Sequence, residues 1–181
     1  MSRSLTLSTR RLKLHAMDER DSERMIALLT DPVVTKTYMV PDFASLDEAY
    51  RMFDRIRALS CNPDRFVYGI YDCDGLVGMI NAVDDDGERI ELGFALLPSV
   101  HRRGYATEAL QACMDELFRM GYAAVRAGAF PENAASLRKS IDCFTMPVRS
   151  IILFVADALN CSPMNSLNSD TAWQIEETIL L

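Results

Sequence analysis

The stretch Leu97-Pro98-Ser99-Val100-His101-Arg102-Arg103-Gly104-Tyr105-Ala106-Thr107-Glu108-Ala109 joins a predicted strand to a predicted amphipathic helix. A helix N-terminus presents unpaired backbone N–H groups and about half a unit of positive charge, which together favour phosphate. Gly104 lets backbone approach a ligand closely, and Arg102 or Arg103 can add charge-assisted hydrogen bonds. The stretch therefore predicts either a phosphate-binding loop or an ordinary solvated loop between a strand and a helix.

The segments on either side of this stretch predict a parallel crossover. Residues 89–96 have strand character, and residues 106–118 carry apolar side chains at helical spacing until Gly121 ends the helix. Residues 122–130 again have strand character. Two strands joined through a helix run parallel in one sheet with a right-handed connection, which predicts an α/β fold.

The N-terminal half predicts further strands and helices around this unit. The expected elements are a strand over 6–15, helices over 18–30 and 45–60, and strands over 65–71 and 76–83. Ser45 and Glu48 have the spacing of a capping box. Asp84-Asp85-Asp86-Gly87 predicts a solvated turn, because the three acidic residues do not complete a calcium loop. These hairpins make the predicted sheet mixed and mostly antiparallel.

Composition excludes several classes of function. The 181 residues carry 19 Lys and Arg against 26 Asp and Glu, a net charge of −7, which argues against a nucleic-acid partner. No apolar run approaches the roughly 20 residues that span a bilayer, so no membrane partner is expected. Only two histidines are present, which argues against a histidine-based metal site, and we expect no metal. Five scattered cysteines without an apolar signal core predict reduced thiols and a cytoplasmic location.

Four segments in the right order resemble the Gcn5-related N-acetyltransferase (GNAT) family. Residues 101–106 resemble its pyrophosphate-binding signature, Q/R-x-x-G-x-G/A, with His101 where the pattern has Gln or Arg. Residues 103–109, Arg-Gly-Tyr-Ala-Thr-Glu-Ala, are similar to the branch that acetylates the N-termini of ribosomal proteins. The other three matches are Leu7–Leu14 with T-x-R-L-x-L-R, Glu91–Leu96 with E-I-G-Y-x-L, and Pro131–Ser136 with the N-x-x-S turn.

The resemblance implies the acyl-CoA N-acyltransferase fold, an α/β fold whose mixed, mostly antiparallel sheet contains a parallel splayed strand pair and has helices on both faces. It also implies an acetyl-CoA-dependent N-acetyltransferase that acts on a primary amine of a protein N-terminus or a small molecule. The alternative is a non-catalytic CoA-binding or assembly module with a degenerate acceptor site. In this family the acceptor is selected by the first helices, here residues 31–60.

The resemblance also assigns a cofactor-binding set. Backbone N–H groups of Phe94 and Leu96, with Ala95 between them, would face the pantetheine and the acetyl carbonyl as an oxyanion hole. The pyrophosphate would lie against the loop and first helical turn, and Asn133 would bind the pantetheine or cap the following helix. The loop residues in this set are Arg102, Arg103, Gly104, Tyr105, Ala106 and Thr107.

Two residues are candidates for proton transfer. Glu91 occupies the position where relatives often have a general base, and strand alternation puts it on one face with Gly93 and Ala95. Its alternative role is a cross-strand ion pair with Arg89 or Arg126. Ser136 matches the family serine that protonates the CoA thiolate, and its alternative role is that of an ordinary serine in a first helical turn.

The last 38 residues depart from the family pattern. Residues 144–181 carry only five of the 45 charged side chains, and no Gly-Phe turn follows the predicted helix over 134–142. We therefore expect a GNAT-like domain over 1–143 and an atypical segment over 144–181, with strands at 150–159 and 172–181. This segment would pack on the same domain or be exchanged in a homodimer. A change of reading frame is one explanation, which sequencing of the encoding DNA tests.

Overall fold

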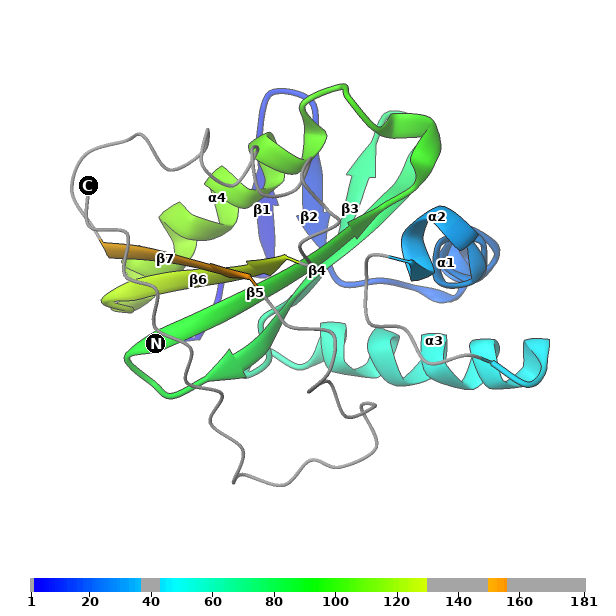
Figure 1. Cartoon of the computed structure of the whole chain (residues 1–181), viewed down its shortest axis with the longest axis horizontal. Helices are drawn as coiled ribbons and strands as arrows, with labels where there is room; N and C mark the ends of the chain where they lie inside the picture. The colour runs from blue at the N-terminus through cyan, green and yellow to red at the C-terminus, as the bar shows by residue number, and fades with distance from the viewer. Residues whose placement is uncertain (1, 37–42, 130–149, 156–181) are drawn as a thin grey trace.

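A seven-stranded sheet forms the centre of the protein in this computed structural model, which describes residues 2–36, 43–129 and 150–155 (Figure 1). The elements are β1 (Thr6–Ser8), β2 (Lys13–His15), a 3-10 turn (Glu19–Asp21), α1 (Ser22–Thr30), α2 (Pro32–Thr35), α3 (Leu46–Cys61), β3 (Val67–Asp72), β4 (Gly75–Asp85), β5 (Arg89–Leu96), a 3-10 turn (Pro98–Val100), α4 (Tyr105–Met120), β6 (Ala124–Ala129) and β7 (Ser150–Val155). None of the described helices is long and apolar enough to cross a bilayer.

The sheet is mixed, as the sequence predicts. Its strands follow the order of the chain, and each pair from β1 to β5 is antiparallel. β5 pairs in parallel with β6 through the crossover helix α4, and β6 pairs in parallel with β7. β7 lies in the low-charge C-terminal segment and covers the first part of the strand expected at 150–159; the strand expected at 172–181 lies outside the described residues.

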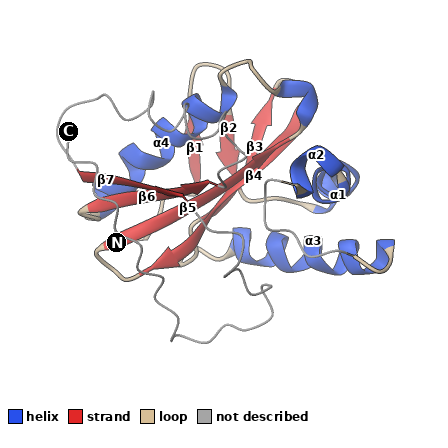
Figure 2. Cartoon of the chain, viewed as in Figure 1, coloured by secondary structure: helices blue, strands red, loops and turns tan. Residues whose placement is uncertain are grey.

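Helices cover both faces of the sheet, which confirms the predicted layers (Figure 2). On one face α4 contributes Leu110 and Leu117 to a buried cluster with sheet residues such as Leu92. On the other face α1, α2 and α3 pack against a second cluster that contains Met79 and Ala95. Alternate residues of β5 thus enter different cores, because successive strand side chains point to opposite faces.

The strand predicted over 6–15 is wrong in one respect, since the structure has a hairpin there. β1 and β2 pair antiparallel, with Leu7 opposite Leu14. The Thr9 N–H donates to the Leu12 carbonyl (2.9 Å), and the Leu12 N–H donates to Thr9 Oγ1 (2.9 Å). The threonine hydroxyl therefore closes a tight turn. The pattern misled because apolar and polar residues alternate in both arms of the hairpin.

The predicted helix starts are largely confirmed. Ser45 Oγ accepts from the Glu48 N–H, so Ser45 caps α3 as expected, although the Glu48 carboxylate bonds to the N–H of Ala44 rather than that of Ser45. The helix expected from Asp18 begins as a 3-10 turn, and α1 proper starts at Ser22. Gly121, with φ 105°, ends α4 as predicted.

The acidic turn before β5 is organised by its own backbone. Asp86 accepts hydrogen bonds from the N–H groups of Glu88 (3.0 Å) and Arg89 (2.6 Å), and its carboxylate also pairs with the Arg89 guanidinium. Hydrogen bonds to those N–H groups lower the pKa of Asp86. The Asp86 carboxylate therefore builds the turn, as predicted, but Asp84 and Asp85, which the sequence placed in the same turn, lie in β4 because their backbones pair with β5.

A buried acid fixes the N-terminal residues to α4. The Glu116 carboxylate accepts from Arg119 Nε (2.7 Å) and from the Ser4 N–H (2.5 Å). The Arg119 hydrogen bond, followed by those of Ser4, outweighs the opposing effect of burial and lowers the pKa of Glu116 to about 2.

We expect Glu116→Gln to destabilise the protein at neutral pH by about 1.5–3 kcal/mol, the range for hydrogen bonds to charged groups. A carboxylate with a depressed pKa stabilises the fold above its unfolded pKa, and this contribution disappears as pH falls to the folded value. Chemical denaturation should therefore show a difference in the free energy of unfolding between wild type and variant. This difference should shrink as pH falls from about 4.5 to about 2. Asp115→Asn, an exposed change on the same helix, is the control, and equal losses in both variants would contradict the assignment.

Candidate active site

β5 and β6 pair over only part of their length. Their parallel register joins Arg89 to Ala124 and ends at Leu92 opposite Ala127. Both strands continue beyond these residues, and among the described residues no pairing joins their remaining parts. The two strands therefore part after Leu92, as expected of a splayed pair.

The backbone of the last β5 residues is directed to both edges of the strand. The Leu97 N–H donates to the Val77 carbonyl (2.9 Å), so the backbone groups of this residue face β4. Because neighbouring residues of a strand direct these groups to opposite edges, the N–H groups of Phe94 and Leu96 face the edge from which β6 has parted. His101 Nε2 lies 2.9 Å from the Leu96 carbonyl oxygen and links this edge to the loop that follows.

The loop between β5 and α4 has two residues in the left-handed region. Gly104, the N-cap of α4, has φ 79°, and Arg102 has φ 62°. A left-handed non-glycine residue is uncommon and marks a constrained backbone. Among the described residues no side chain caps this N-terminus. Arg102 and Arg103 are exposed, whereas the Ala106 side chain is buried in the core, so Ala106 can offer only its backbone to a ligand.

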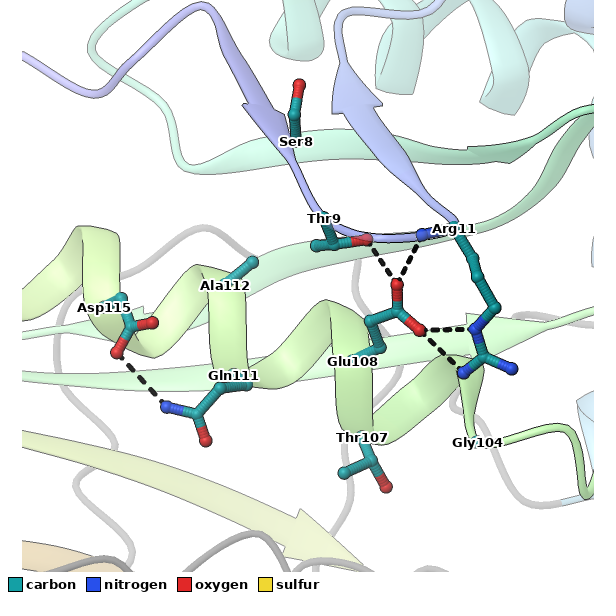
Figure 3. A pocket seen from close by; sticks show the side chains of 9 residues that line it. All are labelled: Ser8, Thr9, Arg11, Gly104, Thr107, Glu108, Gln111, Ala112 and Asp115. Atoms are coloured by element: carbon teal, nitrogen blue, oxygen red, sulfur yellow. Dashed lines mark hydrogen bonds and ion pairs between the residues drawn. The ribbon is translucent and has the colours of Figure 1, made fainter.

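A pocket of about 630 Å³ lies beside the first turns of α4 and the β1–β2 hairpin (Figure 3). Gly104 and Thr107 of the predicted loop line it, together with Arg11 and Glu108. Tyr105 packs under the Arg11 guanidinium, with the Arg11 Cζ 4.9 Å from the ring centroid. Arg11 and Glu108 have no role in the predicted site, although both belong to the segments that resemble the family.

Glu91 lies on the face of the sheet that carries α1, α2 and α3. Ala95 shares its face by alternation and belongs to the core cluster of those helices, whereas Leu92 and Leu96 belong to the cluster with α4. Phe94 also packs on the α4 side. The predicted alternation along β5 is confirmed, and it separates the Glu91 carboxylate from the loop at the start of α4 by the thickness of the sheet.

Glu91 lies in a cross-strand row between a negatively charged and a positively charged residue. Its register partners are Asp84 on β4 and Arg126 on β6. Burial, reinforced by the Asp84 charge and opposed by Arg126, raises the pKa of Glu91 to about 7. The row depends on an irregularity between Ala82 and Asp84, which brings Asp84 rather than Val83 opposite Glu91.

Neither arginine that the sequence offered as an ion-pair partner pairs with Glu91. Arg89 pairs with Asp86 at 3.0 Å, and Arg126 lies 4.0 Å from Asp84 and 3.7 Å from Asp86. Within the part of the chain that the structure describes, no ion pair to Glu91 forms. A half-buried carboxylate with a pKa near neutrality is suited to accept a proton.

Some predicted site residues lie outside the described residues. Asn133, Ser136 and the helix expected over 134–142 all fall between residues 130 and 149. Their assigned roles therefore remain predictions from the resemblance.

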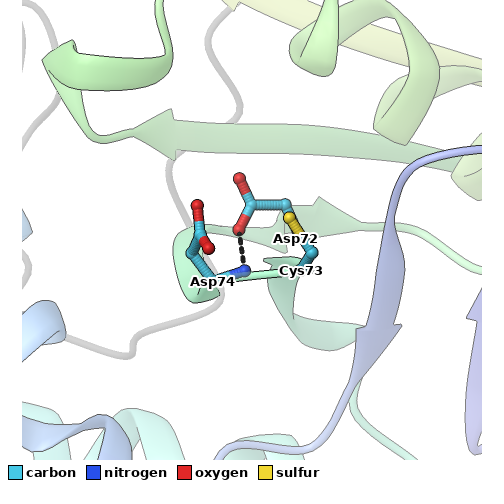
Figure 4. A group of neighbouring side chains, drawn as sticks. All are labelled: Asp72, Cys73 and Asp74. Atoms are coloured by element: carbon cyan, nitrogen blue, oxygen red, sulfur yellow. Dashed lines mark hydrogen bonds between the residues drawn. The ribbon is translucent and has the colours of Figure 1, made fainter.

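A separate group of possible metal ligands occurs in the β3–β4 turn (Figure 4). One ligand atom from each of Asp72, Cys73 and Asp74 lies within 4.8 Å of the others. Asp72 Oδ1 accepts from the Asp74 N–H (2.9 Å), so this acid serves the turn itself. The group is thus accounted for by turn geometry.

Comparison with known proteins identifies the family. The model of the acetyltransferase (GNAT) domain matches residues 11–140. The chain belongs to the GNAT acetyltransferase family. The uncharacterized N-acetyltransferase p20 of Bacillus licheniformis is 30% identical over 138 residues, which cover 74% of this chain and 78% of the relative. This GNAT protein is accordingly an N-acetyltransferase.

Solved structures agree with the fold of this GNAT acetyltransferase. A GNAT-family acetyltransferase from Bacillus anthracis superimposes with a TM-score of 0.66 at 22% identity, covering 77% of this chain and 82% of the other. RimL, a ribosomal L7/L12 alpha-N-protein acetyltransferase solved with coenzyme A, gives a TM-score of 0.64 at 19% identity, with 77% and 82% covered. At these identities the likeness concerns the fold.

Proposed function

We propose that this acetyltransferase moves the acetyl group of acetyl-CoA to a primary amine, at a protein N-terminus or on a small molecule, by direct attack on the thioester. Acetyl transfer is the activity of the family, and RimL, which shares the fold, binds coenzyme A. The observation that carries the proposal is the parting of β5 and β6 next to the N-terminus of α4. It leaves backbone N–H groups at the open edge of β5 and at the N-terminus of α4 available to one extended ligand.

The residues on this path fit an acyl-CoA. The N-terminus of α4 lacks a side-chain cap among the described residues, and backbone donors there favour the pyrophosphate. Exposed Arg102 and Arg103 add positive charge at the same loop. The N–H groups of Phe94 and Leu96 can then hydrogen-bond the pantetheine and the acetyl carbonyl, where negative charge develops during attack.

Proton transfer completes the chemistry. Glu91 accepts a proton from the amine, directly or through water, as the amine nitrogen forms a bond to the acetyl carbon. The carbon–sulfur bond breaks, and the departing thiolate takes a proton. The family resemblance makes Ser136 the donor of that proton. Because Glu91 lies on the α1–α3 face, the amine approaches from that face while the pyrophosphate lies at the α4 end.

We expect the charged neighbours of Glu91 to set the pH dependence of transfer. Asp84→Asn removes a like charge and should move the ascending limb of the pH–rate profile to lower pH, whereas Arg126→Gln should move it to higher pH, each by roughly half a pH unit or more. Asp85→Asn is the matched control, because Asp85 pairs with Ile90 and belongs to the opposite face. If Asp84→Asn and Arg126→Gln moved the ascending limb in the same direction, Glu91 would not be the group that sets it.

Activity is tested by thiol release from acetyl-CoA over a panel of amines, including peptides with free N-termini and polyamines. We expect turnover with at least one primary amine and none with the same peptide after N-terminal acetylation. Binding of acetyl-CoA without turnover on any amine would contradict the proposal and favour a non-catalytic CoA-binding module.

A further inference from the structure

A four-bonded carboxylate connects the β1–β2 hairpin to the first turn of α4 (Figure 3). Glu108 Oε1 accepts from Thr9 Oγ1 (2.6 Å) and from the Arg11 N–H (2.7 Å), while Oε2 pairs with Arg11 Nε and Nη2 at 2.6 Å each. Hydrogen bonds from Thr9 and Arg11 overcome the effect of burial and lower the pKa of Glu108. Residues 97 or 99 positions apart in sequence are thus joined by several hydrogen bonds.

The same arginine also contacts the loop itself. Arg11 Nη1 donates to the Arg103 carbonyl (2.8 Å), and its guanidinium lies over the Tyr105 ring. A side chain added at Gly104 would come within 3.4 Å of Arg11 Nη2. Arg11 therefore touches the residue before Gly104 and the residue after it, and closely approaches Gly104.

The loop needs an external constraint of this kind. Arg102 is a non-glycine residue with a left-handed backbone conformation, which persists only where surrounding contacts enforce it. The Arg11 and Glu108 side chains are 43% and 17% exposed, and exposed ion pairs add little to global stability. The contact is thus better suited to fixing a local conformation than to stabilising the whole fold.

We propose that Arg11 and Glu108 are positioning residues, which hold the loop 101–104 in the conformation that binds the pyrophosphate of acetyl-CoA. The inference rests on the proposed function. Neither residue reacts; Glu108 fixes the Arg11 guanidinium, and Arg11 fixes the Arg103 carbonyl and the Tyr105 ring. Thr9 supports the pair by orienting the Glu108 carboxylate.

The test compares Arg11→Gln, Glu108→Gln and the double variant, with acetyl-CoA and with acetyl-pantetheine, which lacks the pyrophosphate. Each single variant should raise KM for acetyl-CoA about tenfold with little change in kcat, and the double variant should add little, because contacting residues are not additive. Values of kcat/KM for acetyl-pantetheine should stay near wild type. Arg11→Lys, which keeps the charge but not the fork of donors, should restore KM only in part.

The outcomes separate positioning from simple attraction and from misfolding. Arg20→Gln, which removes an exposed Arg–Asp pair of equal length (2.6 Å), is the matched control and should leave KM unchanged. If Arg11 only attracts phosphate by its charge, Glu108→Gln will lower KM, and that result overturns the proposal. Unchanged KM in all variants overturns it as well, and so does an equal loss with acetyl-pantetheine, the sign of general damage. Failure of the wild type to turn over acetyl-CoA would instead overturn the proposed function.

Discussion

A Gly104→Glu variant should bind CoA on the order of 100-fold more weakly than wild type, a loss of about 2.7 kcal/mol. Two effects act together. Gly104 has φ 79°, so any side chain there costs about 1–2 kcal/mol of backbone strain. A carboxylate at the N-terminus of α4 also repels the pyrophosphate, and like charges about 4 Å apart near a protein surface cost up to about 4 kcal/mol.

Calorimetric titration with CoA measures this loss, and a second glycine supplies the control. Gly87 has a similar left-handed φ of 83° and open space where its side chain would lie, and it belongs to the β4–β5 turn at the start of β5. Gly87→Glu therefore adds the same charge and a similar strain away from the loop. Equal CoA affinity in the two variants would show that the loop does not bind the pyrophosphate.

Glu91→Gln should lower kcat about 100-fold or more while leaving the Kd for CoA nearly unchanged. General-base catalysis contributes on this scale, and glutamine cannot accept the proton. Because the pKa of Glu91 is about 7, the fraction of ionised base rises through half near pH 7, so the wild-type rate should rise as pH passes through about 7. The variant should lose this limb and keep only the limb that belongs to the titration of the amine itself.

Steady-state kinetics across pH, with CoA titrations of the same preparations, check this expectation. Asp85→Asn again serves as the control, since it removes a neighbouring acid from the other face of the sheet. A Glu91→Gln protein with wild-type kcat and an unchanged pH profile would exclude Glu91 as the base. A parallel loss of CoA affinity would indicate a structural role for this side chain.

Local sequence patterns predicted the elements whose signals lie close together in the chain. Ser45 caps α3 and Gly121 ends α4, because capping depends on bonds within one turn of a helix. The alternation of Glu91 and Leu92 between faces also follows from strand geometry alone. The prediction of one strand over 6–15 overlooks the turn at Thr9, because apolar and polar residues alternate in each arm and the change of phase between Leu7 and Leu12 is the only local sign of the turn.

The environment of each candidate site residue could not be predicted in this way. The pKa of Glu91 depends on Asp84, which faces it only because the β4 register shifts near Val83. The contact between Arg11 and Glu108 joins residues that are distant in sequence and meet only when α4 packs on the hairpin. Such features arise from tertiary register, which periodicity does not encode.

In the proposed complex, acetyl-CoA lies along the edge that β5 exposes where β6 parts from it, with its pyrophosphate at the start of α4. Amide-resolved hydrogen exchange with and without CoA tests it most directly. With CoA bound, we expect added protection at the N–H groups of Phe94 and Leu96 and across residues 102–106, with little change in the β3–β4 turn at Asp72–Gly75. Protection confined to other segments, or none at these amides while CoA is bound, would contradict it.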